Sequence, residues 1–190
     1  MINPLIQALI FLINTIFGIY ILLLMLRFLL TLMQVGFRGN KLLQLLLKLT
    51  DPPLQLLYTF VPGWKNVDIA AIVLMLLLKM LEWVLVTWLW GKSISLWGLF
   101  ILSTANILSL LIYIFIFSIL IQVILDWVTP HDSYNPIGNI LYYLNEPLLQ
   151  PARNWAKPLQ NYGIDFSPFI VTICLYLADI ILVGFLLQLA

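Results

Sequence analysis

Two six-residue segments of nearly the same character recur in this chain, and each is followed, after a short stretch, by a long apolar run. The first is Thr50–Gln55 and the second is Asn145–Gln150; each contains an acid, then proline, leucine and glutamine. Downstream of each segment an aspartate precedes an apolar helix, Asp68 in the first case and Asp165 in the second. This repetition predicts an internally duplicated chain, which limits the possible architectures to two copies of one unit.

The composition predicts that each copy of the duplicated unit is embedded in a membrane. Of the 190 residues 63% are hydrophobic and only 9% are charged, whereas soluble domains contain roughly 25% charged residues. A membrane span needs about 20 consecutive apolar residues, and four segments satisfy this: 5–33, 69–90, 99–125 and 166–190. We therefore predict an all-α polytopic membrane protein with four transmembrane helices in two repeats, residues 1–95 and 96–190.

Each repeat is predicted to consist of a span, an amphipathic connector and a second span. In the first connector the cations Arg38, Lys41 and Lys48 share one helical arc, with leucines on the opposite side and Leu45 as the exception. A helix with this pattern lies in the headgroup plane, where its cations face anionic lipid. We expect Pro52 to end this connector helix and Pro147 to end the helix of the second connector, because proline disrupts a helix interior.

The distribution of the cations predicts the orientation in the membrane. Lys and Arg residues are concentrated in the two connectors, and only Lys92 lies in the turn between spans two and three. The positive-inside rule then places both connectors in the cytoplasm and both termini outside a bacterial inner membrane. Because both repeats run in the same direction, they are parallel repeats rather than inverted ones. Asp68 and Asp165 suit the N-termini of their helices, where a carboxylate accepts free backbone N–H groups.

Residues 163–168, preceded by Asn135-Pro136 and Glu146-Pro147, stand in an order and at a spacing that resemble those of the YggT family, also called YlmG, of small duplicated membrane proteins of bacteria and plastids. The resemblance covers roughly 180 residues. The chain departs from the family pattern at two places: it has Asn40-Lys41 where Asn-Pro is expected, and Gln150 where an arginine is frequent. The matching residues of the second repeat are Asn135, Pro136, Glu146, Pro147, Arg153, Gly163, Asp165, Phe166, Ser167 and Pro168; those of the first are Leu26, Arg27, Asp51, Pro52 and Asp68.

The resemblance implies several roles that differ from one another. Relatives are implicated in osmotic tolerance and ion uptake, in membrane organisation, and in the assembly of membrane cytochromes. From these we expect a non-enzymatic membrane organiser or assembly factor that presents its cytoplasmic connectors to lipid and to partner membrane proteins. The alternative is a small ion or osmolyte permeation element that contributes to osmotic tolerance.

Four charged residues lie inside or near the ends of the predicted spans. Lys79, Glu82 and Asp179 are intramembrane charges, and such charges normally face protein or water because lipid solvates them poorly. Lys79 can pair with Glu82 three residues away, or with Asp179 in the second repeat. Arg27 can snorkel to the membrane surface or pair with Asp68 or Asp165. We favour a structural ion-pair network over a proton or cation path.

No residue set in the sequence predicts a catalytic, metal or cofactor site. His131-Asp132-Ser133 contains the residue types of a catalytic triad, but three consecutive residues do not converge on one substrate atom. One histidine cannot build a histidine-rich metal site. Cys174 is the only cysteine, which excludes an intramolecular disulfide, and we expect its side chain to be buried. The net charge of +1 gives no reason to expect nucleic acid as a partner. A homo-oligomer is compatible with the predicted organiser role.

Overall fold

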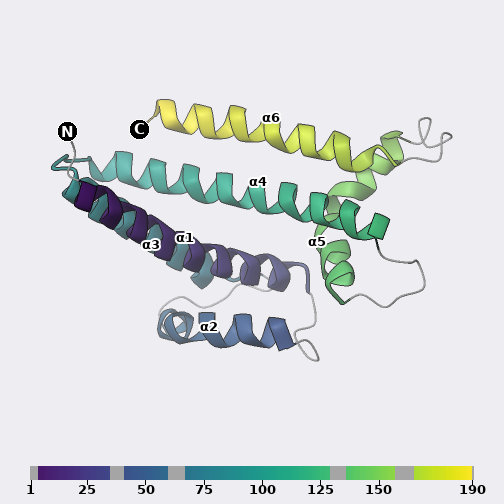
Figure 1. Ribbon diagram of the computed structural model, residues 1–190, viewed down its shortest axis with the longest axis horizontal. Helices are drawn as coiled ribbons and strands as arrows, with labels where there is room; N and C mark the ends of the chain where they lie inside the picture. Colours follow the sequence, from purple (N-terminus) through teal and green to yellow (C-terminus); the bar gives the residue numbers. More distant parts are fainter. Residues whose placement is uncertain (1–3, 35–40, 60–66, 129–135, 157–164, 190) are drawn as a thin grey trace. The chain divides into compact units, whose positions relative to one another are not determined.

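Six α-helices make up nearly all of the described chain. The computed structural model describes residues 4–34, 41–59, 67–128, 136–156 and 165–189 (Figure 1). Arg38, Asn135, Gly163 and the His131–Ser133 segment lie outside the described residues. The helices are α1 (Pro4–Leu32), α2 (Lys41–Tyr58), α3 (Ile69–Leu89), α4 (Leu96–Val128), α5 (Pro136–Ala156) and α6 (Ser167–Gln188).

Four of these helices are long and apolar enough to cross a membrane. They are α1, α3, α4 and α6, with 29, 21, 33 and 22 residues and mean hydropathies of 2.4 to 2.8 over their most apolar stretch. The two other helices, α2 and α5, occupy the predicted connectors. The predicted all-α fold with four candidate spans is therefore confirmed, and the chain is a multi-pass membrane protein.

The prediction that proline ends the connector helices is wrong. Helix α2 continues through Pro52 and Pro53, and α5 continues through Pro147 and Pro151. Proline lacks the N–H that would bond the carbonyl four residues earlier, so Pro53 leaves the Leu49 carbonyl without its helical donor. The hydroxyl of Tyr20 donates to this carbonyl across 3.5 Å. Packing also holds the helices together past the prolines, because Leu54 and Leu149 are completely or almost completely buried.

The described chain divides into two compact units. The first contains residues 1–108 and 183–190. In it α1 and α3 lie side by side (Figure 1), and two small residues at the start of α3, Ala70 and Ala71, are completely buried. Small residues allow two membrane helices to approach closely. Helix α2 packs on this pair through Leu43, Leu46 and Leu54.

The second unit contains residues 109–182. Its helix α5 runs across the end of α4 and the beginning of α6 (Figure 1). One residue from each helix forms the centre of its core: Ile119 of α4, Leu149 of α5 and Val171 of α6. Cys174 of α6 is exposed rather than buried, because α6 has few protein neighbours on that face; on a membrane span such a face contacts lipid.

Candidate functional site

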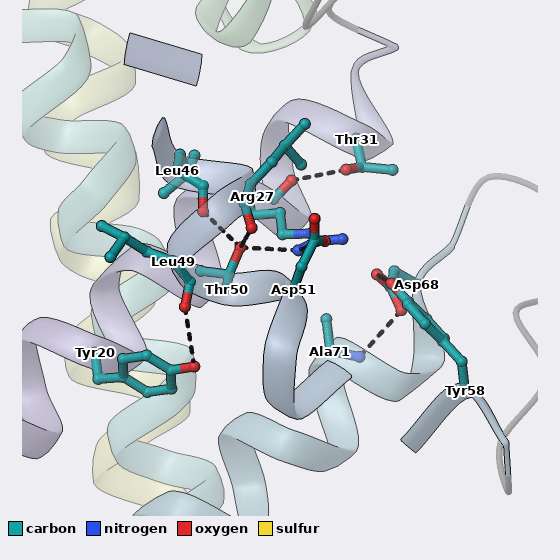
Figure 2. A network of polar contacts seen from close by, with 11 residues as sticks. Tyr20, Arg27, Thr31, Leu46, Leu49, Thr50, Asp51, Tyr58, Asp68 and Ala71 are labelled. Carbon is teal, nitrogen blue, oxygen red and sulfur yellow. Dashed lines mark hydrogen bonds and ion pairs between the residues drawn. The ribbon is translucent and has the colours of Figure 1, made fainter. Parts of the chain in front are cut away.

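A polar network holds the first connector helix against the first span (Figure 2). The guanidinium of Arg27 in α1 donates to the hydroxyl of Thr50 at 2.8 Å and pairs with the carboxylate of Asp51 at 2.6 Å. Arg27 is 8% exposed and Thr50 is completely buried. Within the first unit the partner of Arg27 is therefore Asp51 rather than Asp68, because α2 folds back onto α1 and brings Asp51 to the guanidinium. Snorkelling of Arg27 and its pairing with Asp165 of the second unit stay predictions.

The same network continues to the start of α3. The hydroxyl of Tyr58, the last residue of α2, donates to the carboxylate of Asp68, and Asp68 accepts the backbone N–H of Ala71 at 3.1 Å. Asp68 is thus the N-cap of α3, as predicted. Burial of the phenol, together with its hydrogen bond to the Asp68 carboxylate, raises the pKa of Tyr58 to about 12. A chain of polar contacts therefore links α1, α2 and α3.

The second unit contains a polar network in the corresponding helices. The side chain of Asn145 in α5 accepts from the Ser118 hydroxyl and donates to the Gln122 side chain at 2.8 Å. All three residues are buried. The guanidinium of Arg153 then bridges two carboxylates, Glu146 at 2.8 Å and Asp165 at 3.2 Å. These contacts link α4 to α5 and α5 to the start of α6.

The ion pairs of Arg153 perturb the pKa values on both sides. Burial alone would lower the pKa of the Arg153 guanidinium, but the carboxylates of Glu146 and Asp165 raise it overall. Burial alone would raise the pKa of the Asp165 carboxyl; contacts with Ser167 and Arg153 nevertheless hold it below its ordinary value. The backbone N–H of Ser167, the first residue of α6, donates to Asp165 at 2.9 Å. Asp165 therefore binds the N-terminal end of α6, as its position in the sequence predicts.

The two networks are built from matching positions. Four residues of the first network have a counterpart 95 positions later in the second, and the two aspartates at the span starts are 97 positions apart. The pairs are Arg27 and Gln122, Thr50 and Asn145, Asp51 and Glu146, Tyr58 and Arg153, and Asp68 and Asp165. Two contacts are therefore common to both units: the one between the span and the connector at Thr50 and Asn145, and the one between the connector end and the aspartate before the next span.

The position of the cation is what differs most between the networks. In the first unit the cation is on the span, at Arg27, and it neutralises Asp51 from α1. In the second unit the span carries the neutral Gln122, and the cation is at Arg153 on the connector, where the first unit has Tyr58. Each network keeps a cation on the acid that precedes the proline. A cation paired with this acid is therefore common to both units, although the buried member of the first pair is Arg27 rather than Asp51, whose side chain is 39% exposed.

The comparison with known protein families finds the same duplication that relates the two polar networks. The model of the family described as CCB3/YggT matches residues 6–89 and again residues 101–186. The chain belongs to the CCB3/YggT family. The starts of the two matches are 95 positions apart and the ends 97, the same two offsets that relate the networks.

Three bacterial proteins similar to this CCB3/YggT member are each described as uncharacterized. An uncharacterized protein of Pseudomonas aeruginosa is 35% identical over 180 residues, which cover 93% of this chain and 89% of the relative. An uncharacterized protein of Haemophilus influenzae is 32% identical over 124 residues, 65% of this chain and 64% of the relative. The uncharacterized protein YggT of Escherichia coli K12 is 27% identical over 173 residues, 91% and 88% of the two chains. No solved structure matches the chain.

The intramembrane charges occur in both units. Lys79 and Glu82 of α3 form the predicted pair, with the ammonium 2.8 Å and 2.9 Å from the two carboxylate oxygens. Glu82 is only 5% exposed, so the neighbouring ammonium compensates a charge that lipid would not solvate. Asp179 of α6, in the second unit, is 9% exposed, and its Oδ1 has no hydrogen-bond partner among the described residues. The pairing of Lys79 with Asp179 stays a prediction.

The remaining predicted residues lie on or next to the connectors. Lys41 and Lys48 are exposed on α2, Pro136 begins α5, and Phe166, Ser167 and Pro168 form the start of α6. Among the described residues, no group of three or more histidine, cysteine or acidic side chains is arranged to hold a metal ion. In the described part of the chain, the polar side chains hold the connector helices against the spans.

Three network residues were missed when the sequence was read alone: Ser118, Gln122 and Tyr58. Each is of a type that is ordinary in a membrane helix or at its end, so residue type gives no signal. Alignment of the two halves at the offset of 95 would have identified Gln122 as the counterpart of Arg27 and Tyr58 as the counterpart of Arg153.

The second unit also contains a cavity of about 580 Å³. Most of its wall is apolar, and its polar lining residues include Gln122, Asp126, Arg153 and Asp165. It is lined by α4, by Leu149 and Arg153 of α5 and by the first turns of α6. The polar network of the second unit is therefore accessible from a cavity.

Proposed function

We propose that this protein is a non-enzymatic organiser or assembly factor of a bacterial inner membrane, which presents its connector helices to lipid and to partner membrane proteins. In this proposal the connectors are cytoplasmic and both termini lie outside. The positive-inside rule supports this orientation, because six of the cations are in the connectors and Arg27 lies near the connector end of α1.

The observation that carries the proposal is that α2 has two apolar faces. One face, with Leu43, Leu46 and Leu54, is buried against α1 and α3. The other face carries Leu42, Leu45, Leu49 and Leu56, which are 48 to 71% exposed. These positions recur at steps of three, four and seven residues, so they share one side of the helix. An exposed leucine stripe of this length needs an apolar environment outside the chain.

The cations beside this stripe favour a membrane surface as that environment. Lys41 and Lys48 are exposed on α2, and both lie next to the leucine stripe rather than opposite to it, at helical angles that border it. Leu45, the exception in the sequence pattern, belongs to the stripe. A helix with leucines in the acyl boundary and lysines at the phosphates binds an anionic leaflet through both interactions.

The polar networks explain how such a surface is kept in place. The Arg27–Asp51 pair fixes α2 to the first span, and Asn145 fixes α5 to α4. Tyr58 and Arg153 connect the end of each connector to the next span through Asp68 and Asp165. A connector held at both its middle and its end presents a preformed surface, which lowers the entropic cost of binding a partner.

The decisive experiment compares connector variants with intramembrane variants in a strain that lacks the gene. We expect Lys41→Glu with Lys48→Glu to abolish complementation and the co-purification of partner proteins in mild detergent, while the folded amount in the membrane is unchanged. The matched control is Gln44→Glu with Gln55→Glu, which adds two negative charges to the same helix without removing the lysines. Equal loss in the control, or full complementation by the lysine variant, would contradict the proposal.

A permeation element is the second candidate, and the buried carboxylate of Asp179 without a described partner for Oδ1 favours it. In a path through a low-dielectric core, fixed charges control flux. Purified protein in liposomes tests this candidate directly. A cation flux that disappears in Asp179→Asn or Glu82→Gln, while the protein remains folded, would replace the organiser by a permeation element.

A further inference from the structure

The cavity of the second unit lies where the first unit is closed. The first-unit counterparts of two of its lining residues, Leu120 and Thr172, are Met25 of α1 and Met75 of α3, each 1% exposed. At the matching positions of the second unit, Leu120 is 46% exposed and Thr172 is half-buried, and both line the cavity. At these two positions the first unit is closely packed, whereas the second unit is open.

The cavity is polar at one end and apolar at the other. Asp126 lies near the end of α4, and Arg153 and Asp165 lie beside the start of α6. Ile119 is seven residues before Asp126, about 10 Å deeper along α4. Thr172 lies a little over one turn inside α6. Because these helix ends are at the boundary of the spans, the polar end is at headgroup level and the apolar end at acyl-chain level.

The charge of the polar end distinguishes between kinds of headgroup. Arg153 is already paired with both Glu146 and Asp165, and Asp126 forms no ion pair with the part of the chain that the structure describes. The cavity wall therefore carries the carboxylates of Asp126 and Asp165 and one guanidinium, which Glu146 also neutralises from outside the lining. This excess of negative charge disfavours a purely anionic headgroup and favours one that carries an ammonium group.

We propose that this cavity binds one aminophospholipid of the adjoining leaflet, with its ammonium group at Asp126 and an acyl chain between α4 and α6. The volume is in the range of pockets that hold a single small ligand. The apolar wall of Leu120, Val123 and Phe169 matches an acyl chain, and the acidic end matches the ammonium. This lipid site is independent of the proposed organiser role.

Native mass spectrometry of the purified, delipidated full chain tests the proposal. The protein is offered equal amounts of phosphatidylethanolamine and phosphatidylglycerol with the same acyl chains. We expect one phosphatidylethanolamine to be retained in preference to phosphatidylglycerol. Thr172→Trp, which fills the cavity, should remove this retention, whereas Thr104→Trp should not. Thr104 is a fair control because both threonines donate to the carbonyl four residues earlier, and it does not line the cavity.

A second variant keeps the test valid if Thr172→Trp does not fold. Asp126 is exposed, so Asp126→Asn should leave the fold intact and reduce the preference for phosphatidylethanolamine about fivefold, the effect of one solvent-accessible ion pair. Equal retention of both lipids, retention that neither variant changes, or a preference for phosphatidylglycerol would each overturn the proposal. Because the measurement uses purified protein, its result does not depend on any cellular partner.

Discussion

The position of the cation in each polar network leads to a prediction that can be tested by moving it. In the first unit Arg27 neutralises Asp51 from the span, and in the second Arg153 neutralises Glu146 from the connector, seven residues later in the chain. Tyr58 is likewise seven residues after Asp51. We predict that Arg27→Gln combined with Tyr58→Arg converts the first network into the arrangement of the second and retains its stability.

The expected free energies follow from the exposure of the groups left behind. Asp51→Asn leaves the Arg27 guanidinium, with a side chain only 9% exposed, without a counter-charge and should cost about 3 kcal/mol. Arg27→Gln leaves the Asp51 carboxylate, whose side chain is 39% exposed, so water screens it and the cost should be about 1 kcal/mol. Tyr58→Arg alone places two cations around Asp51 and should also cost about 1 kcal/mol.

The double variant should then be within about 0.5 kcal/mol of the unaltered protein, which corresponds to a coupling of roughly 1.5 kcal/mol. Denaturant unfolding in mixed micelles, followed by tryptophan fluorescence, measures each free energy of unfolding. The reciprocal pair, Gln122→Arg with Arg153→Tyr, is the matched test in the second unit. The reasoning is refuted if the two single losses add within about 0.5 kcal/mol, or if Asp51→Asn costs less than Arg27→Gln.

Two further predictions concern topology and pH. A reporter that is active only in the cytoplasm should give no signal when fused after Ala190, because the positive-inside rule places the C-terminus outside; strong activity there would reverse the proposed orientation. The folded pKa of Tyr58, about 12, is above its ordinary value of 10.0, so the stabilisation from its protonated phenol should be complete below about pH 10 and lost as the pH rises through about 12. The difference in phenolate absorbance between the protein and its Tyr58→Phe variant measures this pKa. Asp68→Asn should lower the pKa of Tyr58, while burial still keeps it above 10. An unchanged pKa in Asp68→Asn would exclude the hydrogen bond as a cause.

The sequence by itself determined the number of helices that can cross a membrane and the two-part duplication. Span length and hydropathy are properties of consecutive residues, so they can be read without knowledge of any contact. The Lys79–Glu82 pair and the cap at Asp68 were predictable for the same reason, because their partners are three residues away on one helix. The amphipathic connector was also predictable, apart from the role of Leu45.

Tertiary structure decided the contacts between helices. Arg27 meets Asp51 rather than Asp68 because α2 folds back on α1, and the direction of that packing depends on side chains of three helices at once. Helix α2 continues past Pro52 because Leu54 is buried and Tyr20 donates to a freed carbonyl, neither of which is a local signal. The cavity between α4 and α6 has the same origin, since an unfilled volume results from how whole helices pack and not from any one segment.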